Sequence, residues 1–434
     1  MEGKQIKVNI RKPKILIFTY YWPPSGGSGV QRWMYFAKYL KQLHYEPIII
    51  TVNESQASYP ILDKSLAKEV EGIKVIKTMT REPLSFYSRL TSGNAKKGIP
   101  QGEVKTKNIF DKIAAYIRGN FFIPDARKGW VPYAIKAAKK VLEEEKINFL
   151  ITTGPPHSSH LIGLELKKQF DLNWWADFRD PWTNIFYNSS LYRSSKTIAK
   201  DYALEKEVLQ KSNGVITTVA GELLNQLKTK APNQTFINLP NGYDADIMQN
   251  TNAAQRKNNF HIVYTGLLTK NQAYTELLKE IHKLSKTNSI YFSLAGKISN
   301  STIIEIKRSL PIVEVEYLGY LSHQNAIALM KSADLLLNFI FKGAETQMIS
   351  GKLLEYMATE VPILSIGDPN SQAAQFLRLG SHAWMVHEQD KSKIKYYLKS
   401  LLEQKTKPKN KTLQLEDWSR KELTLRLVGE VLSL

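Results

Sequence analysis

Residues 14–30, KILIFTYYWPPSGGSGV, decide how the first half of this chain folds. They begin with an apolar run at 14–19, typical of a buried parallel strand, and end with the glycine loop 23–29. Apolar residues then recur at helical spacing from 30 to 43, and a second apolar run follows at 47–52. Strand, helix and strand in this order predict a βαβ unit, which requires a parallel sheet with a right-handed crossover.

The same alternation continues along most of the 434 residues and predicts an α/β protein of two or three domains. Further strands of the first half are expected at 148–153, 174–178, 214–219 and 235–239, with helices at 157–170, 200–211 and 222–230. After an apolar-poor stretch at 250–259, strands are expected at 261–265, 290–295, 313–318, 335–339 and 362–366, with helices that include 272–284, 325–331 and 416–434. The polar stretch 91–98 is expected to be a mobile loop.

Composition restricts the chemistry. The chain has no cysteine, which excludes disulfides, thiolate metal sites and a cysteine nucleophile. No run reaches the roughly 18 apolar residues of a membrane span, and residues 1–5 lack the apolar core of a signal peptide, so a cytoplasmic protein is expected. The net charge of +20 favours polyanionic partners, although a solvated basic surface gives the same composition. The segment 109–130 mixes apolar, aromatic and basic residues, as expected either of contact with an anionic membrane or of ordinary core packing.

The glycine loop 23–29 is the first candidate site. It lacks both the spacing of a Rossmann dinucleotide fingerprint and the Gly-Lys-Ser/Thr of a Walker A loop. What remains is a turn without side chains at a helix N-terminus, which allows close backbone approach to a phosphate or a sugar. A purely structural turn is the alternative.

A second loop, 348–352, also precedes a helix. Ser350 is the expected N-cap, and Lys352 in the first turn opposes the helix dipole unless an anion binds there. Glu355 shares a helix face with Lys352, and its carboxylate is suited to accept hydrogen bonds from ribose hydroxyls. An ordinary salt bridge between Lys352 and Glu355 is the alternative.

A charged cluster follows the expected strand 174–178. Ligands of open α/β sheets bind at the carboxyl ends of strands, where this chain places Asp177, Arg179 and Asp180. Arg179 is suited to hold a phosphate or carboxylate, and Asp180 to accept a hydroxyl proton or bind sugar hydroxyls. An Asp–Arg pair that closes the loop is the alternative.

Two other strand ends carry polar residues. Gly266 and Lys270 follow the first strand of the second half, and Lys270 is placed to reach the same anion as Lys352. His157 and His160 follow the strand 148–153, but no carboxylate pattern accompanies them, so we interpret them as loop or helix-start residues rather than a zinc pair.

Together these motifs resemble a known enzyme family. Residues 20–29, 176–182, 240–244 and 350–362 are similar, in this order, to motifs of the retaining nucleotide-sugar glycosyltransferases of family 4, the group 1 glycosyltransferases, in their surface-polysaccharide type. The resemblance spans nearly the whole chain. It implies a GT-B fold, in which two Rossmann-like domains face each other across a cleft.

The resemblance also implies that the two domains bind different substrates. Residues 1–240 would form the acceptor-side domain, residues 241–415 the donor-binding domain, and a helix at 416–434 would return to the first domain. The implied donor-binding residues are Gly27, Gly29, Gly266, Lys270, Ser350, Gly351, Lys352 and Glu355, and the implied catalytic residues are Arg179 and Asp180. Glu355 would bind the ribose, the lysines would neutralise the diphosphate, and neither a metal ion nor a cofactor would be needed.

The sequence also departs from the family pattern. The family often has a second glutamate eight residues before the ribose glutamate, where this chain has Gln347, with Glu345 two residues earlier. Leu267 and Leu268 stand where a basic residue is usual, and Arg179 and Asp180 occupy the region of the family's histidine.

The expected function is transfer of a sugar from a nucleoside diphosphate to a lipid-linked or growing surface glycan, with retention, at the inner face of the membrane. A GT-B epimerase or hydrolase and a non-catalytic nucleotide-sugar-binding subunit are the alternatives. Nucleic acid is not an expected partner, because the aromatic residues fall mostly in strands and on helix faces rather than in a basic stacking platform.

Overall fold

The computed structural model describes residues 12–59, 61–82, 109–255, 258–341, 349–404 and 408–433. The expected loop 91–98 and the residues Glu345, Gln347 and Met348 lie outside the described residues. The chain forms two compact units, one made of residues up to 178 with 187–216 and 233–235, the other of 179–186, 217–232 and 236–434. The boundary expected at residue 240 and the return of 416–434 to the first domain stay predictions.

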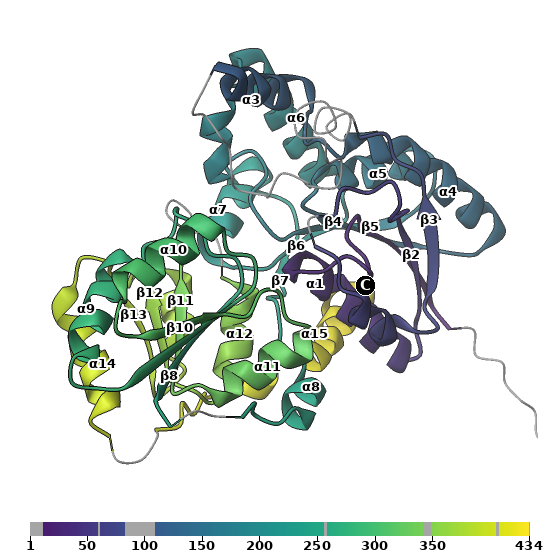
Figure 1. The fold of residues 1–434 in the computed structure, drawn as a ribbon. Helices are drawn as coiled ribbons and strands as arrows, with labels where there is room; N and C mark the ends of the chain where they lie inside the picture. The colour runs from purple at the N-terminus through teal and green to yellow at the C-terminus, as the bar shows by residue number, and fades with distance from the viewer. Residues whose placement is uncertain are drawn as a thin grey trace, which may run out of the picture. The chain divides into compact units, whose positions relative to one another are not determined.

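The first sheet has seven strands in the order β3-β2-β1-β4-β5-β6-β7 (Figure 1). Their bounds are β1 Lys14–Phe18, β2 Glu46–Val52, β3 Lys74–Thr78, β4 Phe149–Gly154, β5 Asn173–Phe178, β6 Gly214–Thr217 and β7 Phe236–Asn238. The α-helices between them are α1 Ser28–Gln42, α3 Ile109–Phe121, α4 Val131–Glu144, α5 Ser158–Lys167, α6 Ser195–Lys211 and α7 Gly221–Lys230. The strand order changes direction between β1 and β4, as in a doubly wound sheet.

A buried ion pair ties α1 to this sheet. The guanidinium of Arg32 contacts the carboxylate of Asp177, at 2.8 Å between Nη2 and Oδ1, and both side chains are almost fully buried. The indole of Trp33 and the hydroxyl of Thr153 each donate a further bond of 2.7 Å to Asp177 Oδ2. These donors balance the cost of burying the carboxylate. Asp177 therefore holds the fold together, and its partner is Arg32 on α1.

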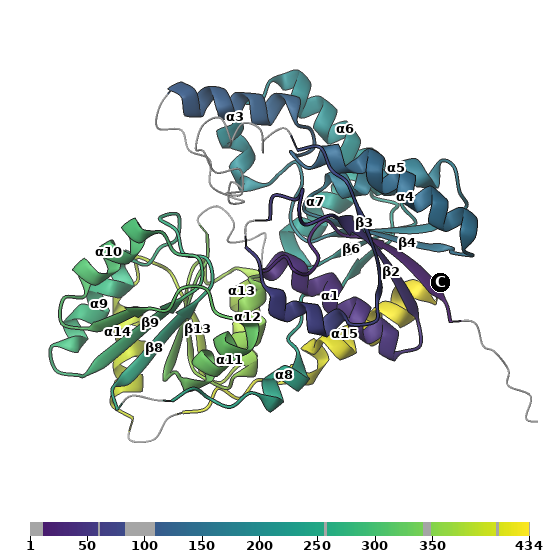
Figure 2. The same cartoon turned by 45° about the vertical axis from the view of Figure 1, so that its right-hand side comes forward.

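The second sheet has six strands in the order β10-β9-β8-β11-β12-β13. Three of them, β8, β9 and β13, are labelled in Figure 2. Their bounds are β8 Phe260–Thr265, β9 Ile290–Ala295, β10 Glu314–Tyr317, β11 Leu335–Phe339, β12 Ile363–Ile366 and β13 Ala383–Val386. The accompanying helices are α8 Ala245–Asn250, α9 Thr275–Ser285, α10 Asn300–Ser309, α11 His323–Ser332, α12 Gly351–Ala358, α13 Gln372–Leu377 and α14 Lys391–Leu402. The expected α/β class with two parallel sheets is confirmed.

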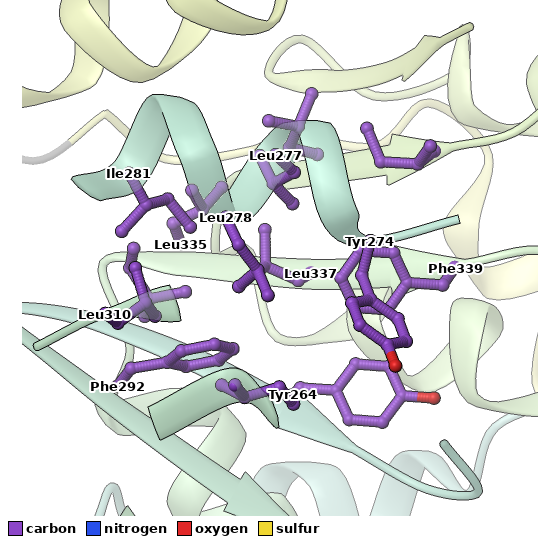
Figure 3. Packing of buried hydrophobic residues seen from close by; sticks show 14 of the residues in the cluster. Tyr264, Tyr274, Leu277, Leu278, Ile281, Phe292, Leu310, Leu335, Leu337 and Phe339 are labelled. Carbon is purple, nitrogen blue, oxygen red and sulfur yellow. The ribbon is translucent and has the colours of Figure 1, made fainter. Parts of the chain in front are cut away.

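Helix α9 shows how the second sheet is covered. Figure 3 shows Leu277, Leu278 and Ile281 of α9 beside Leu335 and Leu337 of β11. All five side chains are at most 2% exposed. Burying a leucine or isoleucine side chain contributes about 1.5–3 kcal/mol relative to leaving it in water. The apolar run of the strand and the apolar face of the helix thus form the core that positions the loops at the edge of the sheet.

The C-terminal segment is divided rather than continuous. A 3₁₀ turn at Leu415–Trp418 is followed by α15, Arg420–Leu427, and by a π-helical turn, Val428–Leu432. Ser419 separates the first two, because its hydroxyl accepts a bond from the N–H of Glu422 and caps α15. The helix expected from residue 416 therefore begins at Arg420.

Candidate functional site

The strand order of the second sheet changes direction between β8 and β11. In doubly wound sheets, ligands bind at this position, beyond the carboxyl ends of the strands. The loop that starts at Gly266 follows β8, and α12 is the helix that follows β11. Both belong to the second compact unit, so this candidate site is described within a single domain.

Glycines line the edge of the sheet at this position. Gly266 has φ +119° and Gly296, at the end of β9, has φ +117°, values that side chains other than glycine rarely adopt. A Cβ on Gly296 would lie 2.2 Å from the carbonyl oxygen of Gly266, and the N–H of Gly296 donates to Gly319 after β10 at 2.7 Å. The turns that follow three adjacent strands therefore meet through backbone alone.

Lys352 lies next to this edge. Its side chain comes within 3.5 Å of the position that a Cβ on Gly266 would occupy, and its Nζ lies 4.0 Å from the ring centroid of Tyr264. Burial lowers the pKa of Lys352 to about 7. Among the described residues it forms no ion pair, neither with Glu355 nor with any other carboxylate. The interpretation of Lys352 and Glu355 as a simple salt bridge is thus wrong for the described side chains.

Helix α12 begins without a side-chain cap. Ser350 occupies the N-cap position, as expected, but its hydroxyl accepts no bond from the first turn, and that turn contains no acidic residue. A Cβ on Gly351 would meet none of the described atoms within 4 Å. The first N–H groups of a helix have no partner inside the helix, and together with the helix dipole they attract anions. An anion at this position would meet the Lys352 ammonium as well.

Glu355 lies one turn further along α12 and is buried. Its Oε1 is 2.7 Å from Nε2 of His323 and 3.4 Å from Nη2 of Arg420. Burial alone would raise the pKa of Glu355, but His323 and Arg420 outweigh it, so the pKa is lowered and the carboxylate is charged. Both partners use Oε1, and no described group bonds Oε2. One carboxylate oxygen is therefore available to accept from a ligand hydroxyl.

Lys270 lies on the same loop as Gly266 but has another neighbour. Its ammonium is 3.9 Å from Glu305 of α10, and its side chain is mostly exposed. Gln272 fixes the loop, because its amide donates to the carbonyls of Leu267 and Phe339 at 3.3 and 3.2 Å. The structure thus brings together Gly266, Lys352 and the start of α12, whereas a role of Lys270 at the same anion stays a prediction.

The glycine loop of the first domain also leads into a helix. Gly27 has φ +88° and is the N-cap of α1, which has neither a side-chain cap nor an acidic residue in its first turn. The loop is held by backbone bonds from Gly26 N–H to Ile61 and from Asp63 N–H to Pro24, of 2.9 and 2.8 Å. A Cβ on Gly27 would meet none of the described atoms within 4 Å, while Gly29 lies in the first turn. The geometry matches the expected open turn, and its ligand stays a prediction.

Arg179 and Asp180 directly follow β5, at the carboxyl edge of the first sheet. Both are half-buried, and the carbonyl of Arg179 accepts a bond of 2.8 Å from Thr218. Their catalytic role stays a prediction.

The two histidines after β4 are packing residues. His160 lies 2.9 Å from Thr152 Oγ1, and its ring stacks on Phe178 with centroids 4.6 Å apart. Over the described stretches of the chain, no three His, Cys, Asp or Glu side chains gather as a metal site would require. His157 is the N-cap of α5 and His160 lies in the first turn of that helix, as expected of loop and helix-start residues.

Four residues of this site were not predicted from the sequence: Tyr264, Gly296, His323 and Arg420. Gly296 directly follows an expected strand, as Gly266 does, so the same signal was present. His323 and Arg420 are 32 and 65 residues from Glu355 along the chain, and no local pattern marks either of them.

Residues 259–404, which contain Gly266, Gly296, Lys352 and Glu355, match the family described as "Glycosyl transferases group 1". This segment is therefore similar to the group 1 glycosyltransferases. No curated protein matches the chain.

Solved structures of similar fold cover nearly the whole chain. Sucrose-phosphate synthase from Thermosynechococcus elongatus is 12% identical, with a TM-score of 0.61 over 97% of this chain and 95% of that one. The N-terminal domain of trehalose-6-phosphate phosphatase from Candida albicans is 13% identical, with a TM-score of 0.62 over 100% and 99%. Anabaena Alr3699/HepE, solved with UDP-glucose, is 10% identical, with a TM-score of 0.60 over 97% and 100%. At these identities the likeness concerns the fold, and the expected GT-B class with its two Rossmann-like sheets is confirmed.

Within the described residues, no helix is both long enough and apolar enough to cross a bilayer.

Proposed function

We propose that the segment 259–404 is a group 1 glycosyltransferase domain that binds a nucleoside-diphosphate sugar, and that the protein transfers the sugar to an acceptor hydroxyl with retention. The observation that carries the proposal is Lys352, whose ammonium lies over Tyr264, beside Gly266 and at the start of α12, with no carboxylate partner among the described residues. A cation and an uncapped helix N-terminus at a sheet switch point suit a diphosphate.

The nucleoside would be held by Glu355. Its charged carboxylate is oriented through Oε1 by His323 and Arg420, which leaves Oε2 for the ribose hydroxyls. Glu355 follows Lys352 by three residues on α12, about one helical turn, so the ribose and the diphosphate of one nucleotide would reach the two side chains. The structure of HepE with UDP-glucose, a protein of similar fold, supports a nucleotide sugar as the ligand class.

The chemistry follows from the leaving group. The bond between the sugar C1 and the diphosphate oxygen breaks, the diphosphate takes the electron pair, and the acceptor oxygen forms a bond to C1 on the same face. The acceptor proton passes to the departing phosphate oxygen. Lys352 and the α12 amides would stabilise the negative charge that develops on the diphosphate, so that neither a metal ion nor a cofactor is required.

Other parts of the proposal concern the first domain and the acceptor. Gly27 and Gly29 would approach the donor, and Arg179 and Asp180 would orient the acceptor hydroxyl and the donor sugar. Residues 1–240 would serve the acceptor and residues 241–415 the donor, with the segment 416–434 returning to the first domain. A lipid-linked or surface glycan acceptor, used at the inner face of the membrane, fits the net charge of +20.

The test is a thermal-shift panel of nucleotides and nucleotide sugars, followed by measurement of nucleotide release with and without an acceptor glycan. Stabilisation follows RT ln(1 + [L]/Kd), so a donor raises the Tm. We expect Lys352→Ala to remove most of the shift, and Lys279→Ala, a lysine on the exposed surface of α9, to leave it unchanged. No shift with any nucleotide, or an equal shift in both variants, would refute the donor site. Equal nucleotide release without an acceptor would identify a hydrolase, and binding without release a non-catalytic subunit.

A further inference from the structure

Helix α3 turns its apolar face outward. Four large side chains at positions i, i+3, i+4 and i+8 form one stripe, and each is between 40% and 64% exposed: Ile113, Tyr116, Ile117 and Phe121. The small residues Ala115 and Gly119 are buried instead. A helix at the surface of a soluble domain normally buries its apolar stripe and exposes its polar one.

The orientation of α3 is fixed by close packing. A Cβ on Gly119 would lie 2.5 Å from the carbonyl oxygen of Leu191, so only glycine allows this approach. The Asn120 side chain donates to the carbonyl of Tyr192 at 3.1 Å and accepts from the N–H of Ser194 at 2.8 Å, and Arg193 donates to the carbonyl of Gly119 at 3.3 Å. Contacts within the first domain therefore determine that the apolar stripe of α3 is exposed.

Helix α6 continues the same surface. Tyr192, Ile198 and Tyr202 are between 43% and 51% exposed. Figures 1 and 2 both show α3 beside α6. Of the fifteen large apolar side chains that are exposed in the described part of the chain, seven belong to this α3–α6 surface. Gathered apolar exposure of this kind marks an interaction site rather than scattered surface residues.

Lysines surround the α3–α6 surface. Lys112, Lys128, Lys196 and Lys200 are all exposed. Burial and the charge of Lys200 lower the pKa of Lys128, although the carboxylate of Asp125 opposes them. Of the acidic residues of α6, Asp201 is buried against Arg193 and Glu205 is buried, whereas Glu207 is partly exposed and lies 3.7 Å from Lys168. The surface thus offers an apolar stripe surrounded by lysines.

We propose that the α3–α6 surface binds an anionic phospholipid bilayer, with the apolar stripe at the boundary between headgroups and acyl chains and the lysines on the lipid phosphates. Tyrosine and phenylalanine next to lysine are typical of helices that lie in this interface. Charge complementarity selects the lipid, because a second copy of the chain would place lysines against lysines. The inference deepens the proposed function, since it assigns a membrane contact to the domain proposed to serve a lipid-linked acceptor.

The experiment is flotation of the full chain with vesicles of phosphatidylcholine alone or with 30 mol% phosphatidylglycerol, a composition chosen because anionic lipids attract basic residues near the membrane surface. We expect binding to the anionic vesicles only, weaker at high salt, and reduced about tenfold in Ile117→Ser/Phe121→Ser and in Lys196→Glu/Lys200→Glu. The matched control is Ile304→Ser/Ile312→Ser, two residues of the second domain that are 66% and 57% exposed.

Three outcomes would overturn the lipid assignment. These are no flotation of the parent protein, an equal loss in the control variant, or a concentration-dependent dimer that the stripe variants abolish, which would assign the surface to a second copy. The nucleotide thermal shift is measured on the same variants and should not change. If the protein binds vesicles but no nucleotide raises its Tm, the donor-site proposal is refuted and the membrane-surface proposal is supported. If nucleotides raise the Tm but the protein does not bind vesicles, the donor-site proposal is supported and the membrane-surface proposal is refuted.

Discussion

The ammonium nitrogen of Lys352 lies 4.0 Å from the centroid of the Tyr264 ring. Tyr264 ends in a hydroxyl that donates to the carbonyl of Leu267 at 2.6 Å, so the ring is fixed by the loop that follows β8. The strand end and the helix start thus meet through a cation–π contact, a pairing of about 0.5–2 kcal/mol. The aromatic face keeps the lysine in position and leaves its charge available, whereas a carboxylate partner would neutralise it.

The pKa of Lys352 gives the first prediction. Burial holds that pKa at about 7, so at pH 8 most molecules carry a neutral Lys352. A bound diphosphate favours the charged form and raises the pKa, so UDP binding at pH 8 should take up close to one proton. Calorimetry in two buffers of different ionisation enthalpy measures this uptake. Lys352→Met should abolish it, and an unchanged uptake in Lys352→Met would assign the proton to another group.

A second prediction separates the ribose from the diphosphate. Glu355→Gln should weaken UDP binding at least tenfold, because an amide oxygen is a weaker acceptor for the ribose hydroxyls than a carboxylate. Binding of inorganic pyrophosphate, which has no ribose, should change by less than about threefold, whereas Lys352→Ala should weaken both ligands. Titration calorimetry with the two ligands provides the comparison. Equal losses of both ligands in Glu355→Gln would contradict the ribose assignment.

Gly266 and Gly296, the glycines at the edge of the second sheet (the glycine edge), give a third prediction with its own control. Gly296→Ala places a Cβ 2.2 Å from the Gly266 carbonyl at φ +117°, so the backbone has to shift. We expect a loss of about 1–3 kcal/mol in unfolding free energy, together with weaker UDP binding. Gly72→Ala, at φ +70° in the first domain, where a Cβ would meet only the flexible end of the Lys41 side chain, should cost about 1–2 kcal/mol and leave UDP binding intact. Urea denaturation and calorimetry test the pair, and a loss of UDP binding in Gly72→Ala alone would be inconsistent with this account.

A buried carboxylate in the first domain gives the fourth prediction. Glu82 accepts hydrogen bonds from Tyr20, from Ser58 at 2.6 Å and from Arg127 at 2.9 Å. Burial nevertheless raises the pKa of Glu82 to about 7, although Arg127 opposes the increase. Between pH 4.5 and 7 the folded protein therefore holds a proton that the unfolded chain has released.

Stability should consequently fall as the pH rises through this range, by up to about 3 kcal/mol from this group. The stabilisation is present below pH 4.5 and is lost as the pH passes 7. Glu82→Gln should flatten that part of the profile, which urea denaturation at several pH values measures. A profile identical to that of the parent would show that Glu82 titrates at its ordinary pKa.

The sequence was sufficient for the central strands and for the edge strands β7 and β10, but not for the edge strands β3 and β13. Strands β1 and β8 are buried on both faces and therefore appear as short apolar runs. The edge strand β3 was not anticipated, because Lys74 and Lys77 are exposed there and interrupt the apolar pattern. For α3, the periodicity indicated an amphipathic segment, but only packing decides which face is buried, and the approach of Gly119 to Leu191 turned the large residues outward.

The candidate site was predictable only where a local rule applies. A glycine after a strand and a lysine in a first helical turn are local signals, so Gly266 and Lys352 were found. The partners of Glu355 come from α11 and α15, and their proximity depends on tertiary structure alone.

The contact between Arg420 and Glu355 affects where the chain can be shortened. Arg420 is held by the backbone bond from its N–H to the carbonyl of Tyr243, of 2.9 Å, and it lies beyond the end of the segment that matches the family. A fragment limited to residues 259–404 would keep Lys352 and the glycine edge but would leave the Glu355 carboxylate with a single cationic neighbour. Such a fragment would represent the intact protein poorly in ligand screening, since Arg420 neutralises part of the charge of a glutamate that precedes it by 65 positions.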